Sequence, residues 1–225
     1  EADESISLVD MQTIQRDSTP LYAQDILHWI LAVHPEQPRL QAALDLLRSW
    51  DGRADRESAG AALFEALRLE LIKSTFKDEL GEQLLARSGP YLIEALGNLL
   101  GQPEAAWFDD VRTPEVEDQE VTILAALTAA VDYLSETLGD DMNAWRWGDL
   151  HTATFENQSL GQSGIAPIEW IFNRGPVETD GTIATVNNTG YNLGHPFEVD
   201  TTPSYRQIVD LGNFANSLSI HTTGQ

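Results

Sequence analysis

His151 is the side chain of this sequence best suited to acid–base chemistry. Asp149 lies two positions earlier in an alternating segment, so the two side chains would project from one face of a strand. An imidazole beside a carboxylate can act as a general base if a nucleophile lies within hydrogen-bond reach. The sequence designates no such nucleophile. We therefore favour the alternative interpretation, a buried imidazole whose two nitrogens tie a strand to a helix.

Other arrangements that could hold a metal ion or a nucleotide are missing from the sequence. The five histidines form no His-x-x-x-His pair, and the acidic pairs Asp109-Asp110 and Asp140-Asp141 are expected in solvated loops. The absence of cysteine excludes disulfides, thiolate catalysis and cysteine-bound metal. Glycine-rich phosphate-binding loops and a Gly-x-Ser-x-Gly nucleophile elbow do not occur. We predict no metal, no cofactor and no catalytic residue in this chain.

The charge balance disfavours two classes of partner. Acidic residues outnumber basic ones by 36 to 13, which gives a formal net charge of −23. A field of that sign repels phosphate backbones and anionic lipids, so neither nucleic acid nor a membrane is expected as a partner. No run of about 18 apolar residues occurs, so no membrane-spanning segment is expected. The acidic opening Glu1-Ala2-Asp3-Glu4 is unlike a signal peptide, so an export signal would lie on another segment.

The elements that position these residues change character along the chain. Apolar residues recur at helical spacing through roughly the first 140 residues. They predict helices at about 4–16, 21–34, 38–49, 58–76, 80–86, 90–100 and 119–138. The segment 101–119 is polar and punctuated by proline, and it is expected to be a surface connection with a short helix at most.

After Trp147 the alternation has period two and predicts strands. We expect them at about 149–154, 182–188, 204–211 and 215–221, with a long loop at 157–180. Asp180-Gly181 favours a hairpin turn. Tyr205 and Arg206 would project to opposite faces, so that one is buried and the other pairs with a carboxylate. We predict a single α+β unit over residues 1–225, with a helical layer at 1–140 and a strand-rich closing segment at 141–225.

Several motifs follow one another in the second half of the chain. They are Trp145-Arg146-Trp147-Gly148-Asp149-Leu150-His151, Asp180-Gly181-Thr182 before Val186-Asn187, Pro203-Ser204-Tyr205-Arg206-Gln207-Ile208-Val209-Asp210-Leu211, and the closing Gly224-Gln225. Their order resembles the last part of the large subunit of the penicillin acylase family. A further likeness lies in residues 47–52 and 58–64, and the resemblance is weakest at 76–120. It implies family-motif positions with structural roles at Trp147, His151, Asp180, Gly181, Asn187, Tyr205 and Arg206.

The resemblance implies an N-terminal nucleophile amidohydrolase with an αββα sandwich built by two chains. In that family a precursor cleaves itself, and the new N-terminal serine attacks an amide carbonyl with its own α-amino group as base. It implies N-acylated small-molecule substrates, such as penicillins and acyl homoserine lactones, and a periplasmic or secreted location. The family's nucleophile, oxyanion asparagine and calcium ligands belong to segments upstream of Asp10, and no Ser-Asn dipeptide occurs here. The expected partners are therefore the small subunit and the N-terminal part of the large subunit.

These observations leave hypotheses of different classes. As the C-terminal part of such an acylase, inactive alone, the chain should have unpaired sheet edges and an exposed apolar face. As an autonomous non-enzymatic α+β binding module related to the acylases, it should have closed edges, a continuous polar surface and a definite pocket. A standalone enzyme using His151 would need a nucleophile that the sequence does not designate.

Overall fold

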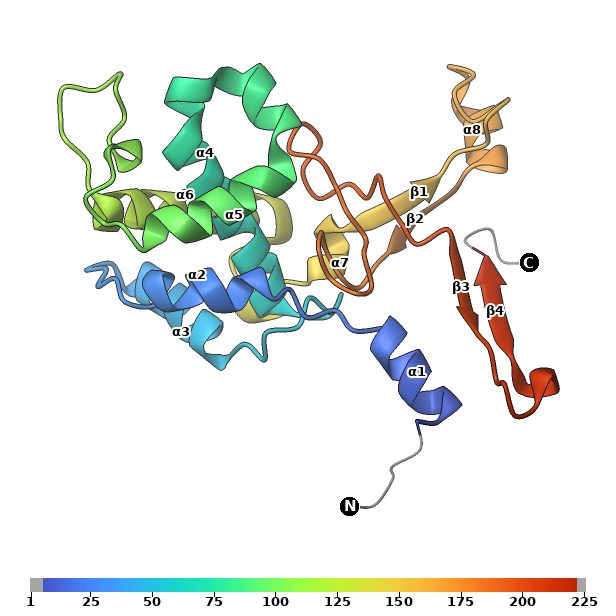
Figure 1. Cartoon of the computed structure of the whole chain (residues 1–225). Coiled ribbons are helices and arrows are strands. Elements are labelled where there is room, and N and C mark those ends of the chain that lie inside the picture. Colours follow the sequence, from blue (N-terminus) through green and yellow to red (C-terminus); the bar gives the residue numbers. More distant parts are fainter. Residues whose placement is uncertain (1–5, 222–225) are drawn as a thin grey trace, which may run out of the picture.

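A computed structural model describes residues 6–221 of the chain (Figure 1). The expected helix start before residue 6 and the closing Gly224-Gln225 motif lie outside the described residues. Helices dominate the first part, and short antiparallel strands follow, so the chain is an α+β protein. The α-helices are α1 (Leu8–Gln15), α2 (Tyr22–Ile30), α3 (Pro38–Ser49), α4 (Ala59–Arg87), α5 (Gly89–Leu100), α6 (Gln119–Leu138), α7 (Trp147–Leu150) and α8 (Ala166–Phe172). Short 3-10 helices are η1 (Ala106–Phe108), η2 (Met142–Ala144) and η3 (Phe214–Asn216).

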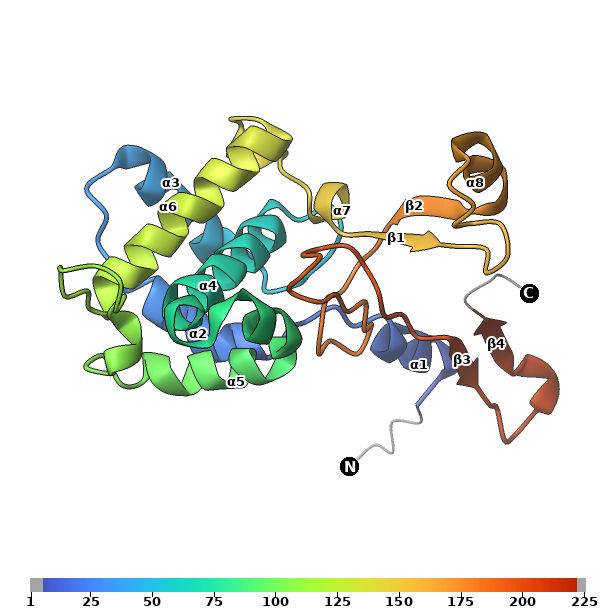
Figure 2. The same ribbon diagram turned by 90° about the horizontal axis from the view of Figure 1, so that it is seen from above.

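Helix α4 is the centre of a helical body formed with α2, α3, α5 and α6 (Figure 2). The Ser58 hydroxyl accepts a hydrogen bond from the Ala61 backbone N–H at 3.1 Å and so caps the helix start. Fully buried alanines, among them Ala62 on α4 and Ala126 and Ala130 on α6, let the two helix backbones approach closely. The helices expected at 58–76 and 80–86 are one element, kinked where Gly81 has a φ of 71°.

Helix α6 is long and apolar enough to cross a membrane, by length and composition alone. In this structure it packs along α4, and one face lies in the core. That burial is the behaviour expected of the core helix of a globular protein. Helices α6 and α3 begin and end at the residues predicted from the sequence.

Among residues 6–221, two separate two-stranded sheets lie beyond the helical body. Strands β1 (Thr152–Phe155) and β2 (Arg174–Glu178) pair antiparallel, and their connection includes α8. Strands β3 (Tyr205–Ile208) and β4 (Leu218–His221) form a second antiparallel pair, the C-terminal hairpin. In Figure 1 the β1–β2 pair with α8 extends away from the helical body, and the C-terminal hairpin lies on the same side, near α1.

Two strand predictions are wrong. Residues 182–188 form turns: Thr182 bonds locally to Thr185 and Thr189, and the Asn187 N–H donates to the distant Asp17 carbonyl instead of to a neighbouring strand. The segment 149–154 is divided between α7 and β1, so Asp149 and His151 share no strand face. The expected loop at 157–180 contains α8 and β2.

The apolar core is confined to the helical body and the loops that cover it. In the structure of residues 6–221, helices α1 and α8 have no fully buried side chain, and every residue of β4 is exposed. Trp170 on α8 is 83% exposed, and Leu211 and Phe214 in the C-terminal hairpin are also largely exposed. The two strand pairs, α1 and α8 therefore have no apolar core of their own within residues 6–221. An isolated two-stranded sheet without such a core is only marginally stable in water.

Candidate functional site

Six of the seven family-motif residues, all except Tyr205, converge with Thr189 where the helical body meets the strands. We call this cluster the motif junction; its members are Trp147, His151, Asp180, Gly181, Asn187, Thr189 and Arg206. Helix α7 is held against the body because the Gly148 backbone N–H donates to the Arg56 carbonyl at 2.8 Å. Trp147 and His151 lie one helical turn apart, so their rings stack with centroids 4.3 Å apart and planes 15° from parallel.

His151 is completely buried, with a partner at each ring nitrogen. Nδ1 lies 2.9 Å from the Phe197 carbonyl oxygen, which can only accept, so we assign the proton to Nδ1. Nε2 lies 2.9 Å from the Thr189 hydroxyl. Burial lowers the pKa of His151 and favours the neutral ring. With both nitrogens occupied inside the protein, neither is available to activate a nucleophile.

Asp149 is not the partner of His151. Its carboxylate accepts from the Arg146 guanidinium at 2.8 Å on the surface. The same guanidinium also contacts Glu57 and Glu178 at 2.7 Å each. The Asp–His arrangement considered from the sequence is therefore absent, because α7 turns the two side chains in different directions.

The Asp180-Gly181 segment forms a loop folded onto the start of α4, and it is no hairpin turn between strands. The Gly181 N–H donates to the Ala54 carbonyl at 2.7 Å, and its own carbonyl accepts from Trp147 Nε1 at 2.9 Å. The φ of Gly181 is +91°, and a Cβ there would overlap the Asn187 carbonyl oxygen. Only glycine fits this position without a shift of the backbone.

The Asp180 and Asn187 side chains tie that loop to its neighbours. The Asp180 carboxylate accepts from the Arg56 backbone N–H at 2.9 Å and from the Arg56 guanidinium at 3.2 Å. Asn187 Nδ2 donates to the Asp180 carbonyl at 3.0 Å, and the Asn187 backbone N–H donates to the Asp17 carbonyl at 2.8 Å. The loop is thus fixed to both the body and the segment after α1.

Arg206 connects the C-terminal hairpin to the motif junction. Its guanidinium donates to Asn187 Oδ1 and, at 3.1 Å, to the Gln15 carbonyl. Burial and the neighbouring charge of Arg16 both lower the pKa of Arg206. The prediction that Arg206 pairs with a carboxylate is wrong for residues 6–221, because its partners there are neutral oxygens. Tyr205 is exposed and stands outside the junction.

A buried ionic cluster lies beside the junction and was missed by sequence reasoning. On α4, Glu65 Oε2 accepts from the Arg68 guanidinium at 2.6 Å, and both side chains are fully buried. Tyr22 donates to Glu65 Oε1 at 2.6 Å, and Tyr191 donates to Glu65 Oε2 at 3.0 Å. A Glu and an Arg three positions apart within an Ala- and Leu-rich helix were the available signal.

This cluster is held in its charged form. Burial raises the pKa of Glu65, but the Arg68 charge and three side-chain hydrogen bonds outweigh burial, so the pKa lies below its usual value. Burial, together with the charge of Glu65, raises the pKa of Tyr22 well above its ordinary value. The cluster therefore joins α2, α4 and the loop at Tyr191 as a fixed ion pair and has no group that titrates near neutral pH.

No group of three or more His, Asp or Glu side chains within residues 6–221 could hold a metal ion. The absence of a cofactor stays a prediction. What the described residues provide is a closed hydrogen-bond network with little reactive chemistry of its own. The geometry defines a structural junction that fixes loops and strands relative to a helical body.

Comparison with known proteins identifies the class. The penicillin amidase family matches residues 1–225, and the chain belongs to that family. The resemblance to the penicillin acylases is thereby confirmed.

Curated relatives include acyl-homoserine lactone acylases named QuiP. The one from Pseudomonas aeruginosa is 31% identical over 211 residues, covering 84% of this chain and 24% of the relative. The one from Pseudomonas syringae pv. syringae is 33% identical over 200 residues, covering 85% of this chain and 24% of the relative. The Pseudomonas putida protein is 29% identical over 238 residues, covering 95% of this chain and 28% of the relative. The chain thus spans about a quarter of the length of these relatives.

Proposed function

We propose that this chain is part of an acylase that hydrolyses the amide bond of N-acyl compounds, with acyl-homoserine lactones as the first substrates to test. The family match over all 225 residues carries this proposal. The names of the relatives, which are acyl-homoserine lactone acylases, support the substrate class. The nucleophilic serine would lie on a part of the acylase outside these residues, and the chain alone would be inactive.

In this proposal the chain serves the reaction as scaffold. The helical body provides a rigid core, and the motif junction sets the position of the C-terminal hairpin through the Arg206–Asn187 hydrogen bond. Within the described part of the chain, no further strand pairs with the outer edges of β2 and β4, and α1, α8 and β4 have no buried side chain. These features support packing against further acylase segments, namely the small subunit and the rest of the large subunit. An export address, expected from the resemblance, would place the enzyme in the periplasm or outside the cell.

The autonomous binding module fits these observations less well. Such a module should close its sheet edges and bury its large apolar side chains, whereas Trp170, Leu211 and Phe214 are largely exposed. The structure also disfavours a standalone enzyme that uses His151 as a base, because His151 is buried and both ring nitrogens are hydrogen-bonded to Phe197 and Thr189.

The test compares the complete acylase with the isolated 225-residue chain on N-acyl-homoserine lactones of several chain lengths. Mass spectrometry would follow release of the free fatty acid and homoserine lactone. We expect turnover by the complete acylase and none by the isolated chain. A complete acylase that hydrolyses no N-acyl amide would refute the proposal. Turnover by the isolated chain that is lost in a folded His151→Gln variant would support the standalone enzyme instead.

A further inference from the structure

Two arginines without a carboxylate partner in the described part of the chain line one hollow beside the C-terminal hairpin. Nine of the 13 basic side chains of this acidic chain form ion pairs, such as Arg39–Asp132 at 2.6 Å and Lys77–Glu82 at 2.9 Å. Arg16 and Arg206 form none within residues 6–221, and neither do Arg87 and Arg174. In a chain with such an excess of carboxylates, two unpaired arginines on the same hollow require an explanation.

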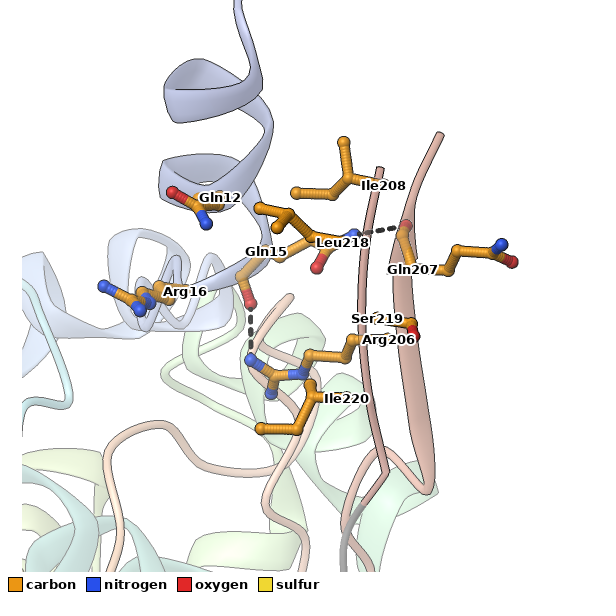
Figure 3. Close-up of a pocket in the computed structure, with 9 residues that line it drawn as sticks. All are labelled: Gln12, Gln15, Arg16, Arg206, Gln207, Ile208, Leu218, Ser219 and Ile220. Atoms are coloured by element: carbon orange, nitrogen blue, oxygen red, sulfur yellow. Dashed lines mark hydrogen bonds between the residues drawn. The ribbon is translucent and has the colours of Figure 1, made fainter. Parts of the chain in front are cut away.

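The two arginines line a hollow of about 310 Å³ between α1 and the C-terminal hairpin (Figure 3). Arg206 lies opposite Ile220 across the strand pair, and Ile208 lies opposite Leu218. Because side chains alternate along a strand, these four residues share the face of the hairpin that lines the hollow. Gln12, Gln15 and Arg16 complete the lining from α1.

Hydrogen bonds fix Arg206 and the adjoining strand against the end of α1. Gln15 accepts from Arg206 through its carbonyl at 3.1 Å, and its side-chain Nε2 donates to the Gln207 carbonyl at 3.1 Å (Figure 3). Partial burial and the nearby charge of Arg16 lower the pKa of Arg206. An anion between them would relieve the repulsion and form charge-assisted hydrogen bonds to the guanidinium groups.

The surroundings of the hollow favour a polypeptide as the source of that anion. Leu218 is 43% exposed and Ile220 is 58% exposed, although both face the hollow. The sheet contains β3 and β4 alone within residues 6–221, so the outer side of β4 carries no third strand there. An added segment would cover apolar side chains and a strand edge together, which a small free anion would leave uncovered.

We propose that an Asp or Glu side chain from the part of the acylase outside residues 1–225 enters this hollow and pairs with Arg16 and Arg206. The inference rests on the proposed function only for the existence of that further part. It specifies one interface of the assembly, with an acidic residue on a segment that also covers Leu218 and Ile220.

Zero-length cross-linking in the complete acylase tests this pairing. An Arg16→Lys variant supplies an amine that a carbodiimide joins to any carboxylate in direct contact, and mass spectrometry identifies the joined peptides. We expect a cross-link from position 16 to an Asp or Glu beyond residues 1–225. Arg39→Lys is the matched control, because its known partner Asp132 should be joined to position 39. A successful control with no cross-link from position 16, or one only to residues 1–225 or to a second copy, would overturn the inference.

A second measurement separates interface from local structure. Arg16→Gln should lower the unfolding temperature of the complete acylase by several degrees, because the incoming carboxylate loses one partner. The same substitution should leave the isolated chain unchanged or slightly more stable, since it removes a like charge near Arg206. Equal effects in both would contradict the pairing. Hydrolysis of N-acyl substrate by the same unmodified preparation reports on the proposed function independently.

Discussion

Replacing Gly181 by alanine should strongly destabilise the isolated chain. The φ of +91° is unfavourable for any residue with a Cβ and costs about 1–2 kcal/mol. The new methyl would also overlap the Asn187 carbonyl and lie 3.1 Å from both the Thr185 and Thr189 hydroxyls. Relief requires a backbone shift that weakens the hydrogen bonds to Ala54 and from Trp147, at roughly 1 kcal/mol each. We expect the free energy of unfolding to fall by roughly 3–4 kcal/mol in total.

Urea unfolding followed by circular dichroism and tryptophan fluorescence measures this change. Gly139→Ala is the matched control, because Gly139 has a similar φ of +97° with open space around its Cβ position. It should lose only the backbone contribution of about 1–2 kcal/mol. If Gly181→Ala costs no more than Gly139→Ala, the close approach of the Asn187 carbonyl does not constrain the loop, and the reasoning about the motif junction fails.

Three further outcomes follow from the same structure. Burial lowers the pKa of His151 in the folded state, so the neutral ring's contribution to stability is complete above pH 6.5 and is lost as the pH falls below that value. Urea unfolding at pH 7.5 and 5.5 should show this loss in the wild type and not in His151→Gln. Glu65→Gln should lower the free energy of unfolding by about 3–5 kcal/mol, because it leaves the Arg68 charge buried and unpaired. The double variant Glu65→Leu/Arg68→Met should lower it by less. A double variant less stable than Glu65→Gln would refute this account. Trp170→Glu on α8 should change the stability of the isolated chain by less than about 0.5 kcal/mol, because the Trp170 side chain is exposed. A larger loss of stability in thermal unfolding would indicate contacts of Trp170 that the structure lacks.

The sequence predicted the long helices well, because their signals are local. Helix α6 has Asp118 as N-cap, accepting from Val121 N–H at 3.0 Å, and it ends before Gly139. Helix α3 begins at Pro38, whose fixed φ suits a first turn. Both elements carry their start signal and their apolar face within one short stretch. Where a local signal was ambiguous, as at Gly81, a kink in one helix replaced the expected break.

The segment after α7 was predicted less well, because its backbone partners are distant in sequence. The loop at 180–188 depends on hydrogen bonds from Gly181 to Ala54 and from Asn187 to Asp17, which no local pattern reveals. The alternation near His151 predicted a strand, but α7 stacks its ring on Trp147. Arg206 was expected to find a carboxylate and instead contacts Asn187 and Gln15.

The sequence by itself determined where the main helices run, because helix signals depend on short-range periodicity. The order of its motifs carried the resemblance to the penicillin amidases, which the family match then confirmed. Only the tertiary structure decided that Trp147, Gly181 and Asn187 meet at one junction, and that Arg16 and Arg206 share a hollow. Contacts between residues far apart in the chain arise from the packing of the whole molecule, and a linear pattern does not specify which partners that packing brings within hydrogen-bond distance.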